Sequence, residues 1–458
     1  MKLHIIDYIS IFLYTILTLY VGVRFKKKIN NDTFLIADRN LSFFASCMTI
    51  SASKVGAGLL VTYSALVFAY GFSALWLFGG YVFGYFIFYF FASKLKIEAD
   101  KYNYYTLSDY FRKKYGSTTA YLISILVFLS MFGWILTNLI GGGKIIALIS
   151  GFSFPTAVIF MGIIIIVYLV AGGFSSVVKT DIMQYLSIIV IFLFLLIVIS
   201  TGGLSNYSTS TTSTIKKIEM GKIIIFFLAG FLFPLGSAEL WQRVYATKSI
   251  KDIKMSLVTA SILYFVFGFV LSLICLRISR LTIDTSSETA LIEGMGVLLP
   301  VGFAGILIVA FFAAIMSSAD TFIFTSSSTF VQDYLQKIFN LNNDSVVKLI
   351  KIFILIFGTL GIILAILLKS IIDVTFLFTA LTLSIGIISL ASWIRSKISP
   401  FSINLAIMAN ILTTLIVLFT FGINMKIIIF SILSTLIFLF IGEIISIVKG
   451  RRTSHNIA

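Results

Sequence analysis

The stretch "SASKVGAGLL", residues 51–60, decides how this chain folds. It lies within a long apolar run, yet it holds the cation Lys54 and the two glycines Gly56 and Gly58. Glycine weakens a helix by roughly 1 kcal/mol relative to alanine, and an ammonium inside a bilayer needs a cavity or a partner. The stretch therefore predicts a membrane helix that is interrupted near its middle.

The composition defines the class of protein. Of the 458 residues, 59% are hydrophobic and 11% are charged, which is typical of a multi-pass membrane protein and excludes a water-soluble domain. The apolar runs have the length of about 20 residues that a transmembrane helix needs, whereas barrel strands would show about 10 residues of alternating polarity. We predict an all-α polytopic membrane protein with about 13 transmembrane helices, at residues 4–24, 42–68, 73–95, 118–149, 154–172, 180–201, 221–242, 255–277, 299–332, 347–369, 372–394, 402–422 and 427–448.

The net charge of +16 reports the topology of the chain and not a nucleic-acid partner. Most of the 34 lysines and arginines fall in alternate loops, which is the positive-inside pattern of membrane proteins. The pattern places the amino terminus outside and the carboxyl terminus in the cytoplasm. We expect the plasma (inner) membrane of a prokaryote, with the lipid bilayer as a partner and no requirement for an oligomer.

A second span carries an interruption like the first. "AGFLFPLGSAE", residues 229–239, holds Gly230, Pro234 and Gly236, and proline in a helix interior removes a backbone hydrogen bond. Paired broken helices mark the binding sites of transporters built from inverted repeats, although small residues also mark tight helix packing. The two spans lie five apart, which divides the chain into residues 1–41 (first helix and loop), 42–201 (first five-helix repeat), 202–220 (extracytoplasmic loop), 221–394 (second repeat) and 395–458 (last two helices and tail).

The ninth span carries a stripe of small and hydroxyl side chains. Its members recur at helical spacing, with Asp320 one step to the side, and are Ala314, Ser317, Ser318, Thr321, Thr325 and Ser328. Hydroxyls on one face can join helices at about 0.6 kcal/mol each. A stripe this dense beside a carboxylate suits a hard cation, which binds several oxygen ligands. The only histidines, His4 and His455, lie at the chain ends, so a membrane enzyme is not expected.

Four motifs carry a resemblance to a known family: "YGFSALW" (70–76), "GGFSSVVKTDIMQ" (172–184), "WQRVYATKS" (241–249) and "AAIMSSADTFIFTSSSTFVQDYL" (313–335). They occur in family order, and the last is the most specific. The chain resembles the sodium/solute symporters, which include proline, pantothenate, sialic acid and sodium/glucose transporters. The resemblance implies a five-plus-five inverted repeat of the leucine-transporter type, alternating access, and sodium as the co-transported ion.

The resemblance also implies ion ligands. The principal sodium site maps to carbonyls at the break of the second span and to a carbonyl and two hydroxyls of the ninth span: Ala52, Val55, Ala314, Ser317 and Ser318. A second sodium site, found in some members, maps to Asp181, Asp320 and Thr321, together with Ser317.

Lys54 departs from the family pattern, in which proline carriers have an aspartate and sugar carriers an asparagine. Three interpretations stay open: Lys54 binds a solute carboxylate, it replaces a sodium ion and couples transport to pH, or it pairs with Asp320 or Asp181 as a structural residue. We expect Lys54, Gly56, Gly58 and Ser237 to line the solute site. Glu239 could line the cavity below the break of the seventh span, but it lies four residues from Arg243, which favours an ion pair on a helix surface. We expect Arg243 to belong to the cytoplasmic loop after that span.

The predicted function is therefore sodium-coupled symport of a small polar solute, an amino acid or an organic acid. Two alternatives are a proton-coupled carrier of the same fold that uses Lys54, and a sensor that binds the solute without moving it.

Overall fold

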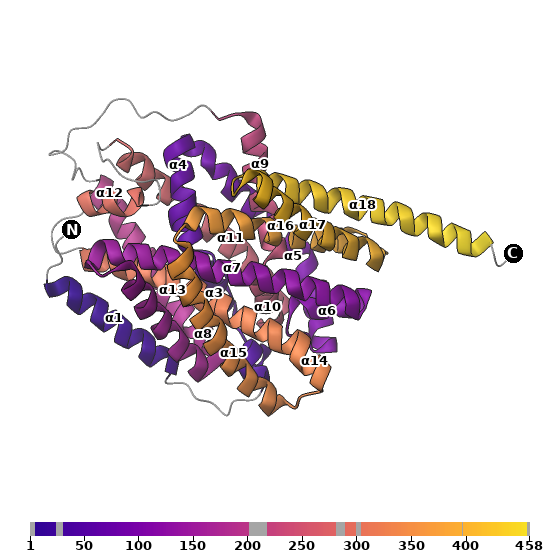
Figure 1. Cartoon of the computed structure of the whole chain (residues 1–458). Coiled ribbons are helices and arrows are strands. Elements are labelled where there is room, and N and C mark those ends of the chain that lie inside the picture. The colour runs from indigo at the N-terminus through magenta and orange to yellow at the C-terminus, as the bar shows by residue number, and fades with distance from the viewer. Residues whose placement is uncertain are drawn as a thin grey trace.

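The computed structural model describes residues 5–23, 31–200, 218–280, 289–298, 304–395 and 397–455 (Figure 1). The predicted extracytoplasmic loop lies mostly outside these residues. The helices are α1 (Ile5–Val23), α2 (Asn31–Ile36), α3 (Phe43–Ala52), α4 (Ser64–Tyr70), α5 (Trp76–Tyr102), α6 (Leu107–Tyr115), α7 (Ser117–Ser150), α8 (Phe154–Ser200), α9 (Met220–Gly236), α10 (Ala238–Ala246), α11 (Ile250–Ile278), α12 (Ala290–Leu298), α13 (Ala304–Phe330), α14 (Gln336–Phe339), α15 (Asn343–Leu368), α16 (Ile371–Ile394), α17 (Pro400–Phe421) and α18 (Lys426–His455). Short 3-10 or π turns are η1 (Ala37–Arg39), η2 (Gly58–Tyr63), η3 (Gly71–Leu75) and η4 (Val331–Leu335).

The helices have the length and composition of membrane spans. By these two criteria ten of the described helical stretches could cross a bilayer, or eleven if α9 and α10 form one span. Two stretches, Gly58–Tyr102 and Phe154–Phe194, have 45 and 41 residues, about twice what one crossing needs. Each contains a glycine with a positive φ of 59°, Gly71 or Gly173, where the chain turns. The predicted all-helical membrane class is confirmed, and the total of 13 spans stays a prediction.

Burial separates a central group of helices from a lipid-facing group. In α13 and α7 the most apolar windows are 89% and 83% buried, whereas the corresponding window of α1 is 22% buried. Figure 1 shows α1 along the edge of the bundle and α18 extending beyond it at the carboxyl end. The exposed side chains of the peripheral helices are large and apolar, which suits contact with lipid. The core around α13 and α7 is therefore the place where polar side chains can be shielded from the bilayer.

Both predicted helix breaks are present. The first span consists of α3, a turn at residues 53–56, and then η2 and α4. The second consists of α9 and α10, which bend by 45° at Ser237, three residues after Pro234. Close packing holds the second broken span in place, because a Cβ at Gly230 would lie 1.9 Å from the carbonyl oxygen of Leu77 on α5. Sequence alone located these breaks because their causes, glycine and proline, act locally.

The two broken spans are joined at the ends that lie away from the cavity described below. The backbone N–H of Leu41, just before α3, donates to the Ala246 carbonyl at 3.1 Å. The N–H of Lys248 in turn donates to the Leu41 carbonyl at 2.8 Å. The hydroxyls of Ser46 and Thr247 lie 2.8 Å apart. These bonds close one side of the bundle between α3 and α10.

Candidate functional site

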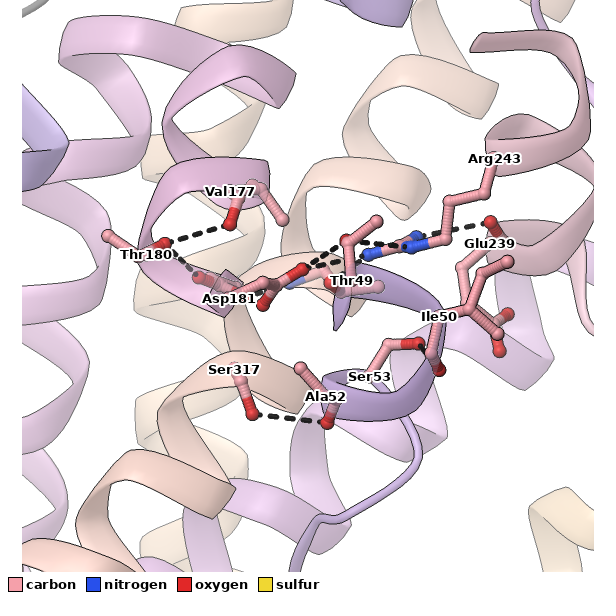
Figure 2. A network of polar contacts seen from close by, with 12 residues as sticks. Thr49, Ile50, Ala52, Ser53, Val177, Thr180, Asp181, Glu239, Arg243 and Ser317 are labelled. Carbon is pink, nitrogen blue, oxygen red and sulfur yellow. Dashed lines mark hydrogen bonds and ion pairs between the residues drawn. The ribbon is translucent and has the colours of Figure 1, made fainter. Parts of the chain in front are cut away.

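The break after α3 frees backbone carbonyls, and hydroxyls of α13 reach them. Ser317 Oγ lies 3.1 Å from the Ala52 carbonyl oxygen and 2.9 Å from that of Ala314, within its own helix. Ser318 Oγ donates to the Ser53 carbonyl at 3.3 Å. Figure 2 shows the contact between Ser317 and Ala52 where the two helices meet. Carbonyl and hydroxyl oxygens thus converge on one point of contact.

The predicted sodium ligands are all buried in this region. Ala52, Ala314 and Ser317 are brought together by direct hydrogen bonds, and the Val55 N–H donates to the Ala52 carbonyl at 3.1 Å. The Ser318 hydroxyl donates to the neighbouring Ser53 carbonyl at 3.3 Å. Carbonyl and hydroxyl oxygens are typical ligands of hard cations. The residues therefore fit a sodium ion, which would take the place of the hydrogen bonds that the serine hydroxyls donate to the carbonyls.

Gly56 allows this close approach of α13 and α7. A Cβ at Gly56 would lie 2.4 Å from Asn138 Oδ1 and 2.6 Å from Ser318 Oγ. Asn138, on α7, also accepts from the Ala57 N–H at 3.0 Å and so holds the broken segment. Sequence reasoning missed Asn138, because an asparagine in an apolar helix gives no sign of the turn that it caps.

Lys54 pairs with a residue that sequence reasoning did not choose. Its ammonium donates to Ser237 Oγ at 2.8 Å and forms an ion pair with Glu239 Oε1. Both partners lie at the break between α9 and α10, so the pair links the two broken spans. The predicted pairing of Lys54 with Asp320 or Asp181 is wrong, because those carboxylates lie on α13 and α8 with other partners.

Arg243 is a core residue and does not belong to a cytoplasmic loop. Its side chain is fully buried and Nη2 lies 3.2 Å from Asp181 Oδ2 and 2.8 Å from Thr321 Oγ1, while Nε lies 3.0 Å from Thr49 Oγ1. Figure 2 shows the guanidinium pointing towards Asp181 and Thr49. Only the backbone oxygen of Glu239 contacts Arg243, at 3.1 Å, so the predicted ion pair between these two side chains is also wrong.

The residues of the predicted second sodium site are already engaged. Arg243 holds Asp181 and Thr321, as described. Asp320 Oδ2 accepts from the Tyr168 hydroxyl at 2.6 Å and from the Thr180 hydroxyl at 3.4 Å. A second sodium here stays a prediction, and the guanidinium beside Asp181 weighs against it because like charges repel.

A cavity opens above the breaks. It encloses about 940 Å³ of atom-free space, a volume that includes its open mouth. Lys54, Gly56 and Gly58 line it, whereas Ser237 accepts from the Lys54 ammonium and does not line it. That these residues bind a solute stays a prediction. Much of the remaining wall is aromatic and includes Tyr81, Trp134, Phe233 and Tyr264. Among the described lining residues, Lys54 is the only one with a charged side chain.

Comparison with known proteins decides the family. The family model described as "Sodium:solute symporter family" matches residues 34–377, which are three quarters of the chain and include both helix breaks and α13. The chain belongs to the sodium:solute symporter family. Membership confirms the predicted family, whose members are transporters, and it confirms solute symport with sodium as the co-transported ion.

Two curated members of this family show the degree of similarity. The chain is 24% identical to the sodium/pantothenate symporter of Escherichia coli (strain K12) over 352 residues, 70% of each chain. It is 22% identical to sodium/proline symporter 2 of Staphylococcus saprophyticus over 353 residues, 72% of this chain and 68% of that protein.

A solved structure shows the fold. A Na+-coupled sialic acid symporter in a substrate-bound outward-open state superposes with a TM-score of 0.80 over 97% of both chains, at 18% identity. This likeness confirms the predicted leucine-transporter type of fold, while the boundaries of the two repeats stay a prediction.

Proposed function

We propose that the protein imports a small carboxylate-bearing solute, an amino acid or an organic acid, together with sodium by alternating access. Sodium binds at Ala52, Val55, Ala314, Ser317 and Ser318, and the solute binds in the cavity at Lys54, Gly56 and Gly58, with Ser237 holding the Lys54 ammonium. The observation that carries the proposal is the contact between Ser317 and the Ala52 carbonyl at the break of α3. Ser53 and Ser318, which follow the two contacting residues in the chain, line the cavity, and this supports an ion site next to the solute.

The ion stabilises the broken helix against α13. Without a cation, the Ser53 carbonyl accepts from the Ser318 hydroxyl, and the Ala52 carbonyl accepts from the Ser317 hydroxyl and the Val55 N–H. A carbonyl left without a partner in the core is unfavourable. Sodium bound there joins α3 to α13 and orders Lys54, which follows Ser53 in the chain. Loss of the ion to the cytoplasm loosens the same contact and releases the solute.

The orientation follows from the charges of the loops. The amino terminus lies outside a prokaryotic plasma membrane and the carboxyl terminus lies in the cytoplasm. The broken spans then join at their cytoplasmic ends, and the cavity faces the exterior. A single subunit contains every group that the mechanism uses, so no oligomer is required.

The test removes the two hydroxyls of the proposed sodium site. Ser317→Ala combined with Ser318→Ala should raise the sodium concentration for half-maximal uptake at least tenfold, or about 1.4 kcal/mol, because two oxygen ligands are lost. Uptake is measured with proteoliposomes of purified protein under an inward sodium gradient.

A matched control lies on the same helix. Ser326 and Ser327 are buried, but their hydroxyls donate only to carbonyls of α13 itself, at Phe322 and Ile323. Ser326→Ala with Ser327→Ala should leave the sodium dependence unchanged. If both double variants behave alike, sodium does not bind at Ser317 and Ser318.

A further inference from the structure

A second cavity opens where α5, α6 and α14 end or begin, on the side of the bundle where the two broken spans join (Figure 1). It has about 980 Å³ of atom-free space, a volume that includes its open mouth. None of its lining residues lines the solute cavity. Its wall combines three tyrosines with three cations, and we call it the basic pocket: Tyr102, Tyr104, Tyr105, Arg112, Lys113 and Lys337.

The basic pocket carries an excess of positive charge. Against its three cations it holds one carboxylate, that of Asp109. Asp109 Oδ2 accepts from two backbone N–H groups just before α6, at 2.8 and 3.1 Å, so its charge is already compensated there. Within the described part of the chain, no carboxylate forms an ion pair with Arg112, Lys113 or Lys337. The pocket is therefore suited to an anion.

Aromatic rings hold two of these cations in place. Lys113 Nζ lies 4.2 Å from the centre of the Tyr102 ring, and the Arg112 guanidinium lies 4.7 Å from that of Tyr121. A ring attracts a cation through its face and leaves N–H groups of the cation available to other acceptors. Phosphate oxygens are strong acceptors for such charged donors. The rings thus position the donors without satisfying them.

The length of α5 places the basic pocket at the level of lipid headgroups. α5 has 27 residues and is therefore about 40 Å long, which is the thickness of a bilayer with its headgroup regions. It begins at Trp76 and ends at Tyr102, and both side chains are exposed. Tryptophan and tyrosine are enriched at the two membrane interfaces. If Trp76 marks one interface, the Tyr102 end of α5 and the pocket beside it lie at the other.

Two helices of the basic pocket also expose large apolar side chains. On α5, Phe90 and Ile97 are more than half exposed, and on α14 the same holds for Ile338 and Phe339, which directly follow Lys337. Exposed apolar side chains beside a basic site at this level suit acyl chains. A small soluble anion would make no use of them.

We propose that the basic pocket binds the headgroup of an anionic phospholipid. Arg112, Lys113 and Lys337 hold its phosphodiester, and its acyl chains lie along the exposed faces of α5 and α14. Basic pockets between membrane helices on the cytoplasmic side are typical headgroup sites. The orientation proposed above assigns the lipid to the cytoplasmic leaflet.

The basic pocket is connected to the helix of the proposed sodium ligands. Asp333 lies in η4, directly after α13, and its backbone oxygen accepts from Arg112 at 3.4 Å. Its carboxylate accepts from the hydroxyls of Thr106, before α6, and Ser124, on α7, at 2.7 Å each. A headgroup at Arg112 adds to the contacts that hold α6 and α7 to the end of α13. Bound lipid should therefore raise the melting temperature.

Native mass spectrometry of the whole chain in detergent tests the proposal. The probes are dioleoylphosphatidylglycerol and dioleoylphosphatidylcholine in equal amounts, which share acyl chains and a phosphodiester but differ in net charge. We expect the phosphatidylglycerol adduct to exceed the phosphatidylcholine adduct by about tenfold. Phosphatidylglycerol should also raise the melting temperature, whereas inorganic phosphate at the same concentration should not.

Matched variants tie this preference to the basic pocket. Lys113→Gln with Lys337→Gln removes two exposed ammonium groups, so the protein should fold, and the preference for phosphatidylglycerol should fall about tenfold. Lys113→Arg with Lys337→Arg keeps both charges and should keep the preference. The control is Lys248→Gln with Lys251→Gln, which removes the same charge from two exposed residues outside the pocket and should also keep it.

Three outcomes overturn the proposal. Equal binding of the two lipids would mean that the pocket does not select an anionic headgroup. Equal loss in the pocket variant and the control would mean attraction by overall charge only, and equal stabilisation by inorganic phosphate would mean a site for a free anion. If the double variant does not fold, Lys337→Gln alone takes its place. The test does not use transport, so its result is independent of the proposed function.

Discussion

Arg243 shows how one side chain can hold three helices together in a membrane core. Its guanidinium bridges Thr49 on α3, Asp181 on α8 and Thr321 on α13, and all three partners are buried. A planar guanidinium has five donors in fixed directions, so it can serve several acceptors at once. Arg243 contacts α3 and α13, and the proposed sodium ion lies between the same two helices. Ion binding is therefore coupled to the packing of α3.

Removal of this cation should destabilise the protein. Arg243→Gln leaves Asp181 buried without a charged partner, and breaking a buried ion pair from one side costs about 3–5 kcal/mol. The melting temperature in detergent should therefore fall markedly. It should recover in part when Asp181→Asn is added, because no lone charge remains.

The control for this prediction is an ion pair at the surface. Arg395 pairs with Glu443 at 3.3 Å, but its side chain is 54% exposed. Surface pairs contribute about 0–1 kcal/mol, so Arg395→Gln should shift the melting temperature little. Equal effects of Arg243→Gln and Arg395→Gln would mean that Arg243 has no special role in stability.

At the scale of elements, the proposed mechanism requires the two broken spans to move relative to each other. Their ends at Leu41 and Ala246 are joined by backbone hydrogen bonds, and Ser46 lies against Thr247. Alternating access requires these ends to separate so that the solute can leave on that side. A covalent link between α3 and α10 should therefore stop transport.

A reversible cross-link tests this requirement. Ser46→Cys with Thr247→Cys, in a background of Cys47→Ala and Cys275→Ala, places two thiols where hydroxyls lie 2.8 Å apart. Oxidation should abolish sodium-driven uptake, and reduction should restore it. Transport by the oxidised protein at the rate of the reduced protein would show that α3 and α10 do not separate there.

The sequence predicted the positions of these helix breaks better than it predicted which charged side chains form ion pairs. Glycine and proline act on the backbone where they stand, so "SASKVGAGLL" and "AGFLFPLGSAE" located both breaks. The pairing of Lys54 with Glu239 depends on how two distant spans pack, and no local pattern reports it. Arg243 follows a helix break by only a few residues, and its burial also depends on the tertiary fold.

At the scale of the whole molecule, an apolar shell surrounds a small set of buried ionisable side chains. Large apolar side chains cover the peripheral helices, and the ionisable groups at the breaks are buried among α3, α8, α10 and α13. The high share of hydrophobic residues predicted this apolar shell, because a membrane protein exposes apolar side chains to lipid however its helices pack. The ion pairs within the core required the structure. The single ion site proposed at the break of α3 predicts one sodium ion for each solute molecule.

The accumulation ratio of the solute in proteoliposomes tests this central claim most directly. With the membrane potential clamped at zero, a tenfold inward sodium gradient should support about tenfold accumulation if one sodium ion accompanies each solute molecule. Two sodium ions would give about a hundredfold accumulation and would contradict a single sodium site at the break of α3. Accumulation that does not change with the sodium gradient would contradict the sodium site at the break of α3.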